Sequence, residues 1–591
     1  MCGIFFSIGF ENLPPSVIDS VAHRGPDGRG WNEFNSPNGP VVMGHRRLAI
    51  VDLSADGHQP MSTEDQRYWV TYNGEIYNYI EIRKELESLG HHFKTKTDTE
   101  VLLKSYLEWG ADCLNRFNGM FAFVIWDDKE KKVFAARDRF GVKPLYYYRQ
   151  GNKIAFASEI KQLLSIPEYV LLIDQDHLSF FLLFRHHPLS NSTLFQKIYH
   201  LEAGHVFTEK KHGYAAEVWY KPQYSKEGGN LEEKFLALFQ DSVKKRLIAD
   251  VPVGALLSGG LDSSSIVCMI SELSKKNSAY KDVETFTSWS PDLLVDERFY
   301  SNAVAEKTGL YNHLCEIKDE SLQSDIEKII YHQEEPIFSA SIQSEWNIYK
   351  NISQKTKLKV VLDGQGSDEL TGGYLFMIPY FLSHYLKNGS IFSALKEFYS
   401  SLRVHKNLKG KTLAMDTLLQ ICPEIISCIQ SARGKNSDFS GLKNFDNFQD
   451  YTIYLLKRSI EPQLRWQDRS SMAFSIESRQ PFLDYRLVEF LISLPPEKKF
   501  QKGNTKVIIR EAMKGILPEI VRNRVTKFGF PSPQETLINN LDQDYLSYYL
   551  AKGNAIIENM NIDFFDRAHD SNQNVLASFS LGLWAEQFKV S

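Results

Sequence analysis

The hydrophobic pattern of this chain changes at residues 221–230, and that change constrains the fold more than any other feature. Before it, short β-prone runs are separated by Gly, Asp and Asn, with few stretches of helical spacing. After it, strand, loop and helix units follow one another, as in a parallel sheet flanked by helices. The segment itself, KPQYSKEGGN, is polar and carries Pro and a Gly pair. Since 591 residues exceed what one core supports, we predict a layered α+β domain over 1–215 and an α/β domain over 231–591.

Composition narrows the classes of partner. The chain has 68 basic and 73 acidic residues, a net charge of −5, so no general attraction to nucleic acid or an anionic membrane is expected. No basic leader precedes the first apolar run, and no apolar stretch approaches the roughly 20 residues that span a bilayer. FFLLF at 180–184 is too short for that and is predicted to lie in a core. We expect a cytoplasmic, unanchored protein that acts on small molecules.

Cys2 is notable because a single methionine precedes it. One hypothesis is a small apolar residue at the start of the buried strand that Ile4 and Phe6 indicate. The other is a nucleophile, because removal of Met1 would give Cys2 both a thiol and an α-amine that can act as its base.

No CxxC pair or Cys/His cluster at zinc spacing occurs, so we expect a reducing compartment. The six cysteines are Cys2, Cys113, Cys268, Cys315, Cys422 and Cys428.

The strongest local signal in the second domain is SGGLDSS, residues 258–264, between an apolar strand and a helical run. Two glycines and small hydroxyl residues let backbone N–H groups approach an anion, and a helix start adds partial positive charge. A tight turn alone would explain one glycine but not the whole run. GxxxxGK[ST] occurs nowhere in the chain, so hydrolysis of the Walker A type is not predicted.

A second loop, DGQGSDE at residues 363–369, follows another predicted strand. The carboxyl ends of parallel strands share one edge of a sheet, so this loop and SGGLDSS are expected to face one another. Asp262 and Asp368 would then bracket Mg²⁺ on bound phosphates, because Mg²⁺ takes one or two carboxylates together with phosphate oxygens.

Three polar stretches of the first domain together suit glutamine. Each alone is weak, because a lone Asn-Gly-Glu is more often a turn than a site. Arg47 can hold an α-carboxylate in a bidentate pair, and Asp98 can hold an α-ammonium. The Asn73 amide and the Gly74 N–H can stabilise the oxyanion that forms when Cys2 attacks the side-chain amide.

Eight ordered motifs carry a resemblance to a known family. They are Cys2-Gly3-Ile4, HRGPDG (23–28), HRRLAIVD (45–52), NGEIYN (73–78), RDRFGVKPLYY (137–147), SGGLDSS (258–264), GQGSDE (364–369) and SIESRQPFLD (475–484). In this order they resemble glutamine-hydrolysing asparagine synthetases of the bacterial type. The resemblance implies an N-terminal-nucleophile glutaminase with a layered αββα sandwich, fused to an ATP pyrophosphatase domain with a parallel sheet and many helices.

By this likeness, Cys2 attacks glutamine, and the ammonia travels inside the protein to the second site. Water would convert ammonia to ammonium, which cannot attack, and an enclosed path prevents that loss. Asn73 and Gly74 would assist the attack. The implied glutamine-binding residues are Arg47, Leu48, Ala49, Ile50, Val51, Asn73, Gly74, Glu75 and Asp98.

In the second domain, the likeness implies that ATP activates a carboxylate as an acyl-adenylate and that ammonia then displaces AMP. Lys506, in GNTKVIIREA, would neutralise developing charge near the phosphates. Glu477 and Arg479 are predicted to serve the acceptor pocket, since a guanidinium suits a substrate carboxylate; a structural ion pair is the alternative. The implied ATP-binding residues are Leu257, Ser258, Gly259, Gly260, Asp262, Ser263, Ser288, Asp363 and Gly364.

Gln365 departs from the best-known bacterial pattern, which has a glutamate between the two glycines of this loop. Glutamine cannot carry a charge or take up a proton at neutral pH. We predict aspartate as the acceptor, which yields asparagine, and the alternative is another carboxylate, such as a sugar uronic acid in surface-polysaccharide biosynthesis. A phosphoribosyl amidotransferase would not need SGGLDSS, and a non-catalytic protein is not expected with Cys2, Asp262 and Lys506 intact. A homodimer is expected from the family.

Overall fold

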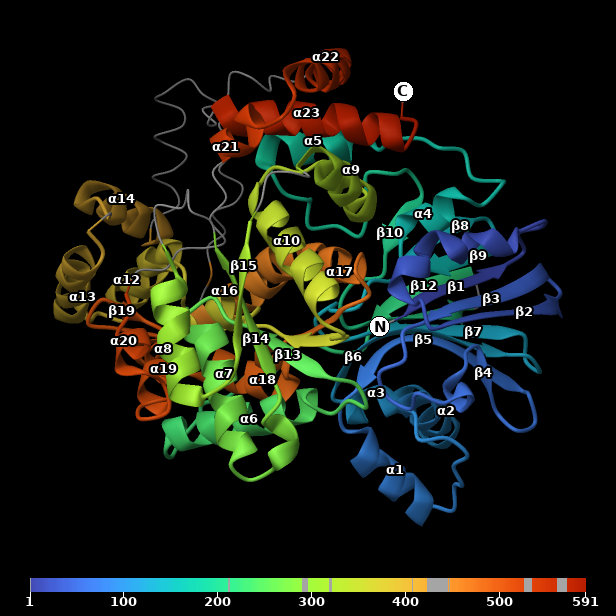
Figure 1. The fold of residues 1–591 in the computed structure, drawn as a ribbon, viewed down its shortest axis with the longest axis horizontal. Coiled ribbons are helices and arrows are strands. Elements are labelled where there is room, and N and C mark those ends of the chain that lie inside the picture. The colour runs from blue at the N-terminus through green and yellow to red at the C-terminus, as the bar shows by residue number, and fades with distance from the viewer. Residues whose placement is uncertain are drawn as a thin grey trace.

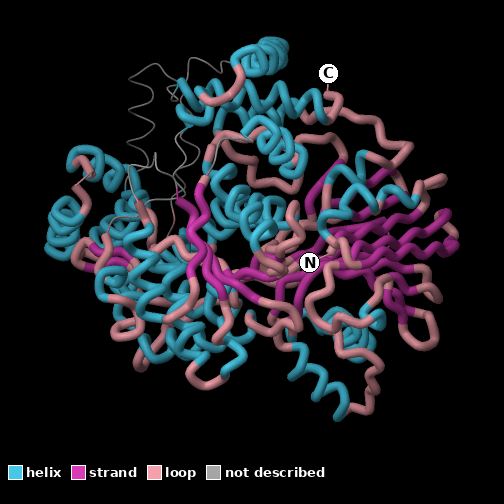
Figure 2. The backbone as a smooth tube through the Cα atoms, viewed as in Figure 1, coloured by secondary structure: helices cyan, strands magenta, loops and turns pink. Residues whose placement is uncertain are grey.

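The computed structural model describes residues 2–210, 213–289, 296–317, 322–406, 408–421, 445, 447–525, 534–560 and 571–590. Strands gather in one half of the molecule and helices in the other, with a second group of strands between them (Figure 2). Most of a predicted surface loop at 434–450 lies outside the described residues, as do Cys422 and Cys428.

Two antiparallel sheets form the N-terminal half (Figure 1). The first has the strand order β10-β8-β9-β1-β3-β2, and the second has the order β12-β11-β7-β6-β5-β4. The strands are β1 (Gly3–Ile8), β2 (Gly28–Ser36), β3 (Gly39–Arg47), β4 (Met61–Ser62), β5 (Tyr68–Ile76), β6 (Gly119–Asp127), β7 (Lys132–Arg137), β8 (Tyr146–Gln150), β9 (Lys153–Ala157), β10 (Ile198–His200), β11 (His205–Lys210) and β12 (Gly213–Val218).

The alternation of side chains along β1 explains how these sheets stack. Ile4, Phe6 and Ile8 enter the core between the two sheets, whereas Phe5 joins the core on the opposite face. Helices cover both outer faces: α1 (Tyr79–Ser88), α2 (Asp98–Trp109) and α3 (Cys113–Arg116) pack on the second sheet. On the first sheet lie α4 (Ile160–Leu164) and α5 (Gln175–Phe184). The predicted αββα layering is confirmed.

The C-terminal half is built on a parallel sheet with the strand order β15-β14-β13-β16-β17. Its strands are β13 (Val253–Leu256), β14 (Glu284–Trp289), β15 (Asn312–Glu316), β16 (Val360–Leu362) and β17 (Glu477–Arg479). One face packs on α6 (Leu231–Arg246), α7 (Leu261–Ser274) and α18 (Tyr485–Ser493). The other face packs on α10 (Ser341–Lys355), and α17 (Glu461–Met472) also contacts α10 and β17. The predicted α/β class is confirmed.

The remaining described segments of this half are mostly helical. They are α8 (Arg298–Thr308), α9 (Leu322–Gln333), α11 (Ser367–Thr371), α12 (Ile378–Lys387), α13 (Ile391–Val404), α14 (Gly410–Ile421), α16 (Phe448–Leu455), α19 (Val507–Ala512), α20 (Glu519–Arg522), α21 (Gln534–Asn539), α22 (Gln543–Asn559), α23 (Ser571–Gln587) and the hairpin β18 (Phe500–Gln501) and β19 (Asn504–Thr505). α23 packs against α22 and α9 and shares a core with α5 (Figure 1).

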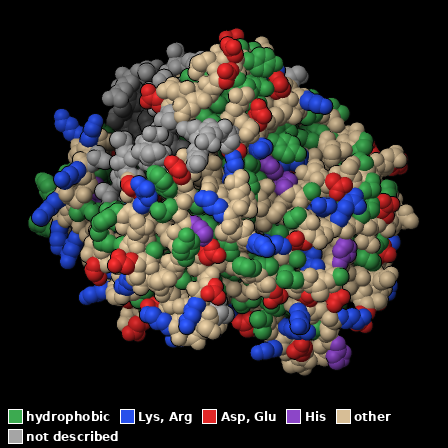
Figure 3. Space-filling view, in the orientation of Figure 1, with side chains coloured by type: hydrophobic (Ala, Val, Ile, Leu, Met, Phe, Trp, Pro, Cys, Tyr) green, Lys and Arg blue, Asp and Glu red, His purple; other side chains and the backbone are tan. Residues whose placement is uncertain are grey.

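The surface carries side chains of both charges. Acidic and basic side chains are interspersed over most of the face in Figure 3, and basic ones gather at the left edge near α13 and α14. Among the described helices, none is both long and apolar enough to cross a bilayer. In FFLLF, Phe181 and Leu182 are buried in α5, as predicted for a core segment.

Candidate functional site

Cys2 immediately precedes β1 and lies beside Asn73 of β5 in the facing sheet. Its backbone nitrogen donates a hydrogen bond to Asn73 Oδ1 over 2.9 Å. The Asn73 Nδ2 atom is buried and has no hydrogen-bond partner among the described residues. Burial raises the pKa of the Cys2 thiol, so attack by this sulfur needs a base. A nucleophile and an unused N–H donor therefore lie close together, as oxyanion stabilisation requires.

Most of the predicted glutamine-binding residues line one small cavity with Cys2. Ala49 and Asn73 are not part of this lining: the Ala49 N–H donates to Asp27 Oδ2 at 2.8 Å, and Asn73 lies beside the Cys2 nitrogen. The lining also contains residues that sequence analysis missed, and these come from the segment after β3, from β5 and from the start of α2. The predicted lining residues are Arg47, Leu48, Ile50, Val51, Gly74, Glu75 and Asp98, and the missed ones are Gly57, Gln59, Tyr72, Thr97 and Thr99.

The Arg47 guanidinium is fixed by the loop that follows β3. It donates to the backbone carbonyl of Ser54 at 2.6 Å and to that of Asp52. A Cβ atom on Gly57 would lie only 2.0 Å from Arg47 Nη2, so a side chain at this position would displace the guanidinium. A guanidinium has five N–H donors, and the two used here leave others for a ligand carboxylate.

Asp98 is positioned at the start of α2 by neighbouring donors. Its Oδ2 atom accepts from the Tyr72 hydroxyl at 2.8 Å and from the Ile76 N–H at 2.9 Å. Burial raises the pKa of Asp98. A ligand ammonium beside Asp98 would favour its ionised form, because an opposite charge stabilises a buried carboxylate.

The SGGLDSS loop joins β13 to α7 in the conformation expected of an anion-binding loop. Gly259 has a φ of +72°, and a Cβ atom there would lie 2.7 Å from Tyr300 Cβ, so the chain needs glycine. The Ser258 N–H donates to Ser263 Oγ at 3.1 Å. The loop therefore leads directly to the N-terminus of a 14-residue helix, where backbone N–H groups lack partners within the helix.

The second loop packs directly on the first. β13 and β16 are parallel neighbours, and a Cβ atom on Gly364 would lie 2.9 Å from Asp262 Cβ. Ser367 Oγ donates to Asp262 Oδ1 at 2.7 Å. Two motifs about one hundred residues apart therefore meet at the carboxyl edge of the sheet, as the strand order requires.

Lys506 occupies the position between the two acidic residues. Its Nζ atom lies 2.5 Å from Asp262 Oδ2 and 2.7 Å from Asp368 Oδ1. Burial alone would lower the pKa of Lys506, but the two carboxylates outweigh it and raise that pKa. This arrangement does not fit a Mg²⁺ ion held between both carboxylates, because an ammonium already lies there. The Mg²⁺ site stays a prediction.

These loops form the floor of a cleft with a volume of about 520 Å³. An adjoining cavity of about 550 Å³ contains Gly260 and Lys506. Gln365 lines the cleft of about 520 Å³. So do three residues that sequence analysis missed, Glu345, Gln463 and Trp466. They project from α10 and α17, whose spacing is that of ordinary amphipathic helices. The other predicted residues in the cleft lining are Leu257, Ser258, Asp262, Ser263, Ser288, Asp363, Gly364 and Asp368.

Glu477 and Arg479 are not brought to this cleft. They lie fully buried on β17, with Arg479 Nε 2.6 Å from Glu477 Oε1. Arg479 also donates to the carbonyls of Arg246 and Ile248, and its Nη2 lies 3.5 Å from Glu75 at the glutamine cavity. The structural ion pair, which was the alternative prediction, describes this arrangement.

A second buried charge network crosses between the two halves. Arg24 Nε donates to the Cys2 carbonyl at 3.0 Å, and Arg24 Nη1 lies 2.8 Å from Asp468 of α17. Glu159 pairs with Arg24 at 2.9 Å and with Arg469 at 2.8 Å. These partners are at most 4% exposed, so water screens them little.

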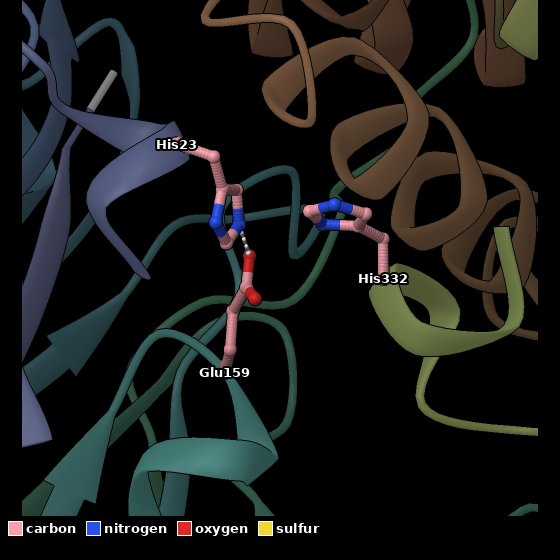
Figure 4. Close-up of side chains that lie close together, drawn as sticks. All are labelled: His23, Glu159 and His332. Atoms are coloured by element: carbon pink, nitrogen blue, oxygen red, sulfur yellow. Dashed lines mark hydrogen bonds and ion pairs between the residues drawn. The ribbon is translucent and has the colours of Figure 1, made fainter. Parts of the chain in front are cut away.

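His23, Glu159 and His332 come together in this network (Figure 4). Their candidate ligand atoms lie within 4.8 Å of one another, and His23 Nε2 lies 3.1 Å from Glu159 Oε1. The same carboxylate pairs with Arg24, Lys161 and Arg469. A metal ion here would meet three side-chain cations, so the cluster is the centre of an ion-pair network between the halves.

The two cavities and the two folds define a glutamine amidotransferase joined to a nucleotide-binding amide-forming domain. A model of the glutamine amidotransferase domain matches residues 1–220, and a model of asparagine synthase matches residues 234–584. The chain belongs to the glutamine-hydrolysing asparagine synthetase family, and the asparagine synthase domain implies ATP use.

Individual relatives extend this result over most of the chain. The chain is 32% identical over 560 residues to glutamine-hydrolysing asparagine synthetase 1 of Bacillus subtilis (strain 168), covering 90% of this chain and 85% of that protein. It is 28% identical over 594 residues to amidase chry2 of Gibberella zeae, covering 89% and 85%. The solved glutamine phosphoribosylpyrophosphate amidotransferase from B. subtilis shares 18% identity at a TM-score of 0.28, over 54% of this chain and 67% of that one.

Proposed function

We propose that this enzyme forms an amide on a carboxylate acceptor, with glutamine as the nitrogen donor and ATP as the activating substrate, and that the acceptor is aspartate. The observation that carries this proposal is the presence of two separate cavities in one chain. One surrounds Cys2 with Arg47 and Asp98, and the other surrounds the SGGLDSS loop with Asp262. Family membership supports both half-reactions.

In the first half-reaction, the Cys2 sulfur attacks the side-chain amide of glutamine, with the Cys2 α-amine as base once Met1 is removed. Asn73 Nδ2 and the Gly74 N–H stabilise the oxyanion. Arg47 holds the α-carboxylate of glutamine and Asp98 its α-ammonium. Ammonia leaves, and water releases glutamate from the thioester.

In the second half-reaction, an oxygen of the acceptor carboxylate attacks the α-phosphorus of ATP, and pyrophosphate leaves. Ammonia then attacks the acyl carbon and AMP leaves. Backbone N–H groups from Ser258 to Ser263 hold the phosphates. Lys506 stabilises negative charge on the departing pyrophosphate, because its ammonium is already held in position by Asp262 and Asp368.

A second candidate keeps this chemistry but replaces aspartate with another carboxylate, such as a sugar uronic acid. The uncharged Gln365 in the cleft lining favours it, because an amide both donates to and accepts from the hydroxyl groups of a sugar acid, and the best-known bacterial pattern has a glutamate at this position. A family relative at 28% identity is named an amidase, which shows that the family includes enzymes with other names.

AMP release with glutamine, ATP and magnesium, measured against a panel of carboxylic acids, tests the proposal. Aspartate is expected to give the highest rate, with one AMP and one glutamate formed per asparagine. A nucleotide-linked uronic acid that exceeds aspartate would select the second candidate. If no acid in the panel causes pyrophosphate release, the proposed chemistry is wrong.

A further inference from the structure

The helix α13 has two apolar faces, and one of them points to solvent. Phe398 and Leu402 attach the helix to the core shared by α12, α14 and α16. On the outward side, Phe392 is 89% exposed and Tyr399 is 67% exposed, and Ile391 and Leu395 are exposed beside them. A surface helix of a globular protein normally has a single apolar face, which packs on the core. We call Ile391, Phe392, Leu395 and Tyr399 the outer face of α13.

Basic residues surround this outer face. Lys396 and Arg403 each follow an exposed aromatic residue, Phe392 or Tyr399, by four positions, so they lie on the same side of the helix. Basic side chains gather at this edge of the molecule in Figure 3. The exposed basic residues of the segment 387–418 are Lys387, Lys396, Arg403, Lys406, Lys409 and Lys411.

The positive charge of this segment is not balanced locally. Its acidic residues are Glu397, which is buried, and Asp416, which is half-buried. None of the six exposed cations has a carboxylate partner among the residues that the structure describes. The whole chain has a net charge of −5, so the excess of cations is a property of this segment and not of the average surface.

The outer face is carried on a helix that is fixed beside the nucleotide cleft. Glu397 Oε2 accepts from the Gly503 N–H at 3.0 Å, and His405 Nε2 donates to the Gly503 carbonyl at 2.9 Å. Gly503 lies in the turn of the hairpin of β18 and β19, and Lys506 follows that hairpin. The end of α13, at Val404, lines the cavity that contains Lys506.

Apolar exposure and positive charge together select the class of partner. In a two-fold contact between copies of this chain, the same cations would face one another, so charge repulsion opposes that contact. Nucleic acid would neutralise the cations but would offer little to aliphatic side chains such as Ile391 and Leu395. A bilayer with anionic head groups meets both requirements, because head groups pair with Lys and Arg while apolar side chains enter the acyl boundary.

We propose that the outer face of α13 docks this enzyme on the surface of a membrane that contains anionic lipids. The helix lies in the plane of the interface, with Phe392, Leu395 and Tyr399 inserted and with Lys396 and Arg403 at the head groups. This inference goes beyond the proposed function and does not depend on it, because no residue of the outer face lines either cavity.

Cosedimentation with vesicles tests the proposal. Wild-type enzyme is expected to pellet with vesicles of phosphatidylglycerol and phosphatidylcholine, to stay in solution with phosphatidylcholine alone, and to be released as the salt concentration rises. Lys396→Gln/Arg403→Gln should lower the vesicle partition coefficient roughly 30-fold, because each cation near an anionic surface contributes about fivefold. Phe392→Ser should lower it roughly 10-fold, because its ring no longer enters the acyl boundary.

Two matched controls change equally exposed residues elsewhere. Tyr311→Ser, at a residue that is 69% exposed before β15, and Lys84→Gln/Lys129→Gln, in the N-terminal half, should bind vesicles as the wild type does. Wild-type glutaminase activity shows that each variant is folded, since none of these residues lines a cavity.

A wild-type enzyme that does not pellet with anionic vesicles overturns the proposal, whatever the variants do. Equal pelleting with phosphatidylcholine alone, or by a folded Phe392→Ser enzyme, also overturns it. If the wild type ignores vesicles but forms a dimer that Phe392→Ser abolishes, the outer face is a contact between copies of the chain and the proposal is wrong.

Discussion

At the scale of single residues, the decisive contact in the first domain joins the Cys2 backbone nitrogen to Asn73 Oδ1. In the structure the backbone N–H of Cys2 donates to the Asn73 amide oxygen, so the amide nitrogen points away from this bond. The unused Nδ2 donor is then available for the oxyanion.

Cys2→Ala is expected to abolish glutamine-dependent amide synthesis and to leave synthesis from added ammonia, because the second cleft does not use the thiol. Glutamate release and AMP release, each measured with glutamine or with ammonium chloride, separate the two effects. Cys113→Ala is the matched control, since Cys113 is buried in the same domain outside the cavity. Full glutamine use by Cys2→Ala would show that another group is the nucleophile.

Gly373 is a second residue whose role is steric. A Cβ atom there would lie 1.8 Å from Asp368 Oδ1 and 2.4 Å from Lys506 Cε. Gly373→Ala is therefore expected to displace the ion triad and to lower the rate of AMP release roughly 10- to 100-fold, because small displacements of catalytic groups carry large rate penalties. Glutaminase activity should stay within about twofold.

Gly228→Ala serves as the control for this variant, because nothing lies within 4 Å of a Cβ atom at that position. Wild-type AMP release by a folded Gly373→Ala enzyme would show that the geometry around Lys506 does not limit the rate.

At the scale of elements, the hairpin of β18 and β19 is flanked by two buried lysines with opposite environments. Lys506, after β19, is paired with two carboxylates, and their charges raise its pKa. Lys499, before β18, is fully buried, its Nζ atom has no hydrogen-bond partner among the described residues, and burial lowers its pKa to about 7. Pairing, and not burial, decides which of the two lysines stays charged.

Lys499→Met is expected to stabilise the protein at pH 7. A lysine with a pKa of about 7 in the folded state and about 10.5 in the unfolded state binds fewer protons when folded. As the pH falls from about 10.5 to about 7, the unfolded state takes up a proton that the folded state does not, so the free energy of unfolding decreases. Each unit of depression corresponds to about 1.4 kcal/mol. We expect a gain on the order of 2–4 kcal/mol at pH 7 that shrinks towards pH 10, measured by denaturant unfolding.

Lys514→Met, at an exposed position, should show neither the gain nor its pH dependence. A stability difference for Lys499→Met that is the same at pH 7 and at pH 10 would mean that Lys499 does not titrate in this range.

At the scale of the whole molecule, α17 connects the two active sites. Gln463 and Trp466, three residues apart, line the cleft. Asp468 and Arg469, from the same helix, pair with Arg24 and Glu159 of the N-terminal half. Because Arg24 also donates to the Cys2 carbonyl, a single helix lines the cleft and is linked through Arg24 to Cys2, the proposed nucleophile.

Asp468→Asn is expected to lower the free energy of unfolding by roughly 3 kcal/mol, because one partner of a buried ion pair loses its charge. Glutamine-dependent synthesis should fall more than ammonia-dependent synthesis, since Arg24 no longer holds Cys2 firmly. Denaturant unfolding and the ratio of glutamate to AMP provide the two readouts.

Asp19→Asn is the matched control, because Asp19 pairs with Arg29 at the surface, where an ion pair contributes little. Equal effects of the two substitutions on stability and on the glutamate-to-AMP ratio would show that the buried network does not couple the sites.

The sequence by itself determined the two fold classes and the positions of Cys2, the SGGLDSS loop and the loop at 363–369. Local signals suffice there, because strand alternation, glycine-rich turns and helix starts are properties of short segments. Arg47 and Asp98 were also identified, and the structure places both in the cavity of Cys2. A loop whose conformation depends on a few adjacent residues can be predicted from a short sequence motif.

Only the tertiary structure decided what lies between these segments. Lys506 lies between Asp262 and Asp368, and Arg479 faces Glu75 instead of the cleft. Glu345 enters the cleft from a helix whose spacing is that of any packed helix. The burial of a side chain, its charged partners and its close contacts depend on residues that are hundreds of positions apart in the sequence. They are therefore set by how the sheets and helices pack.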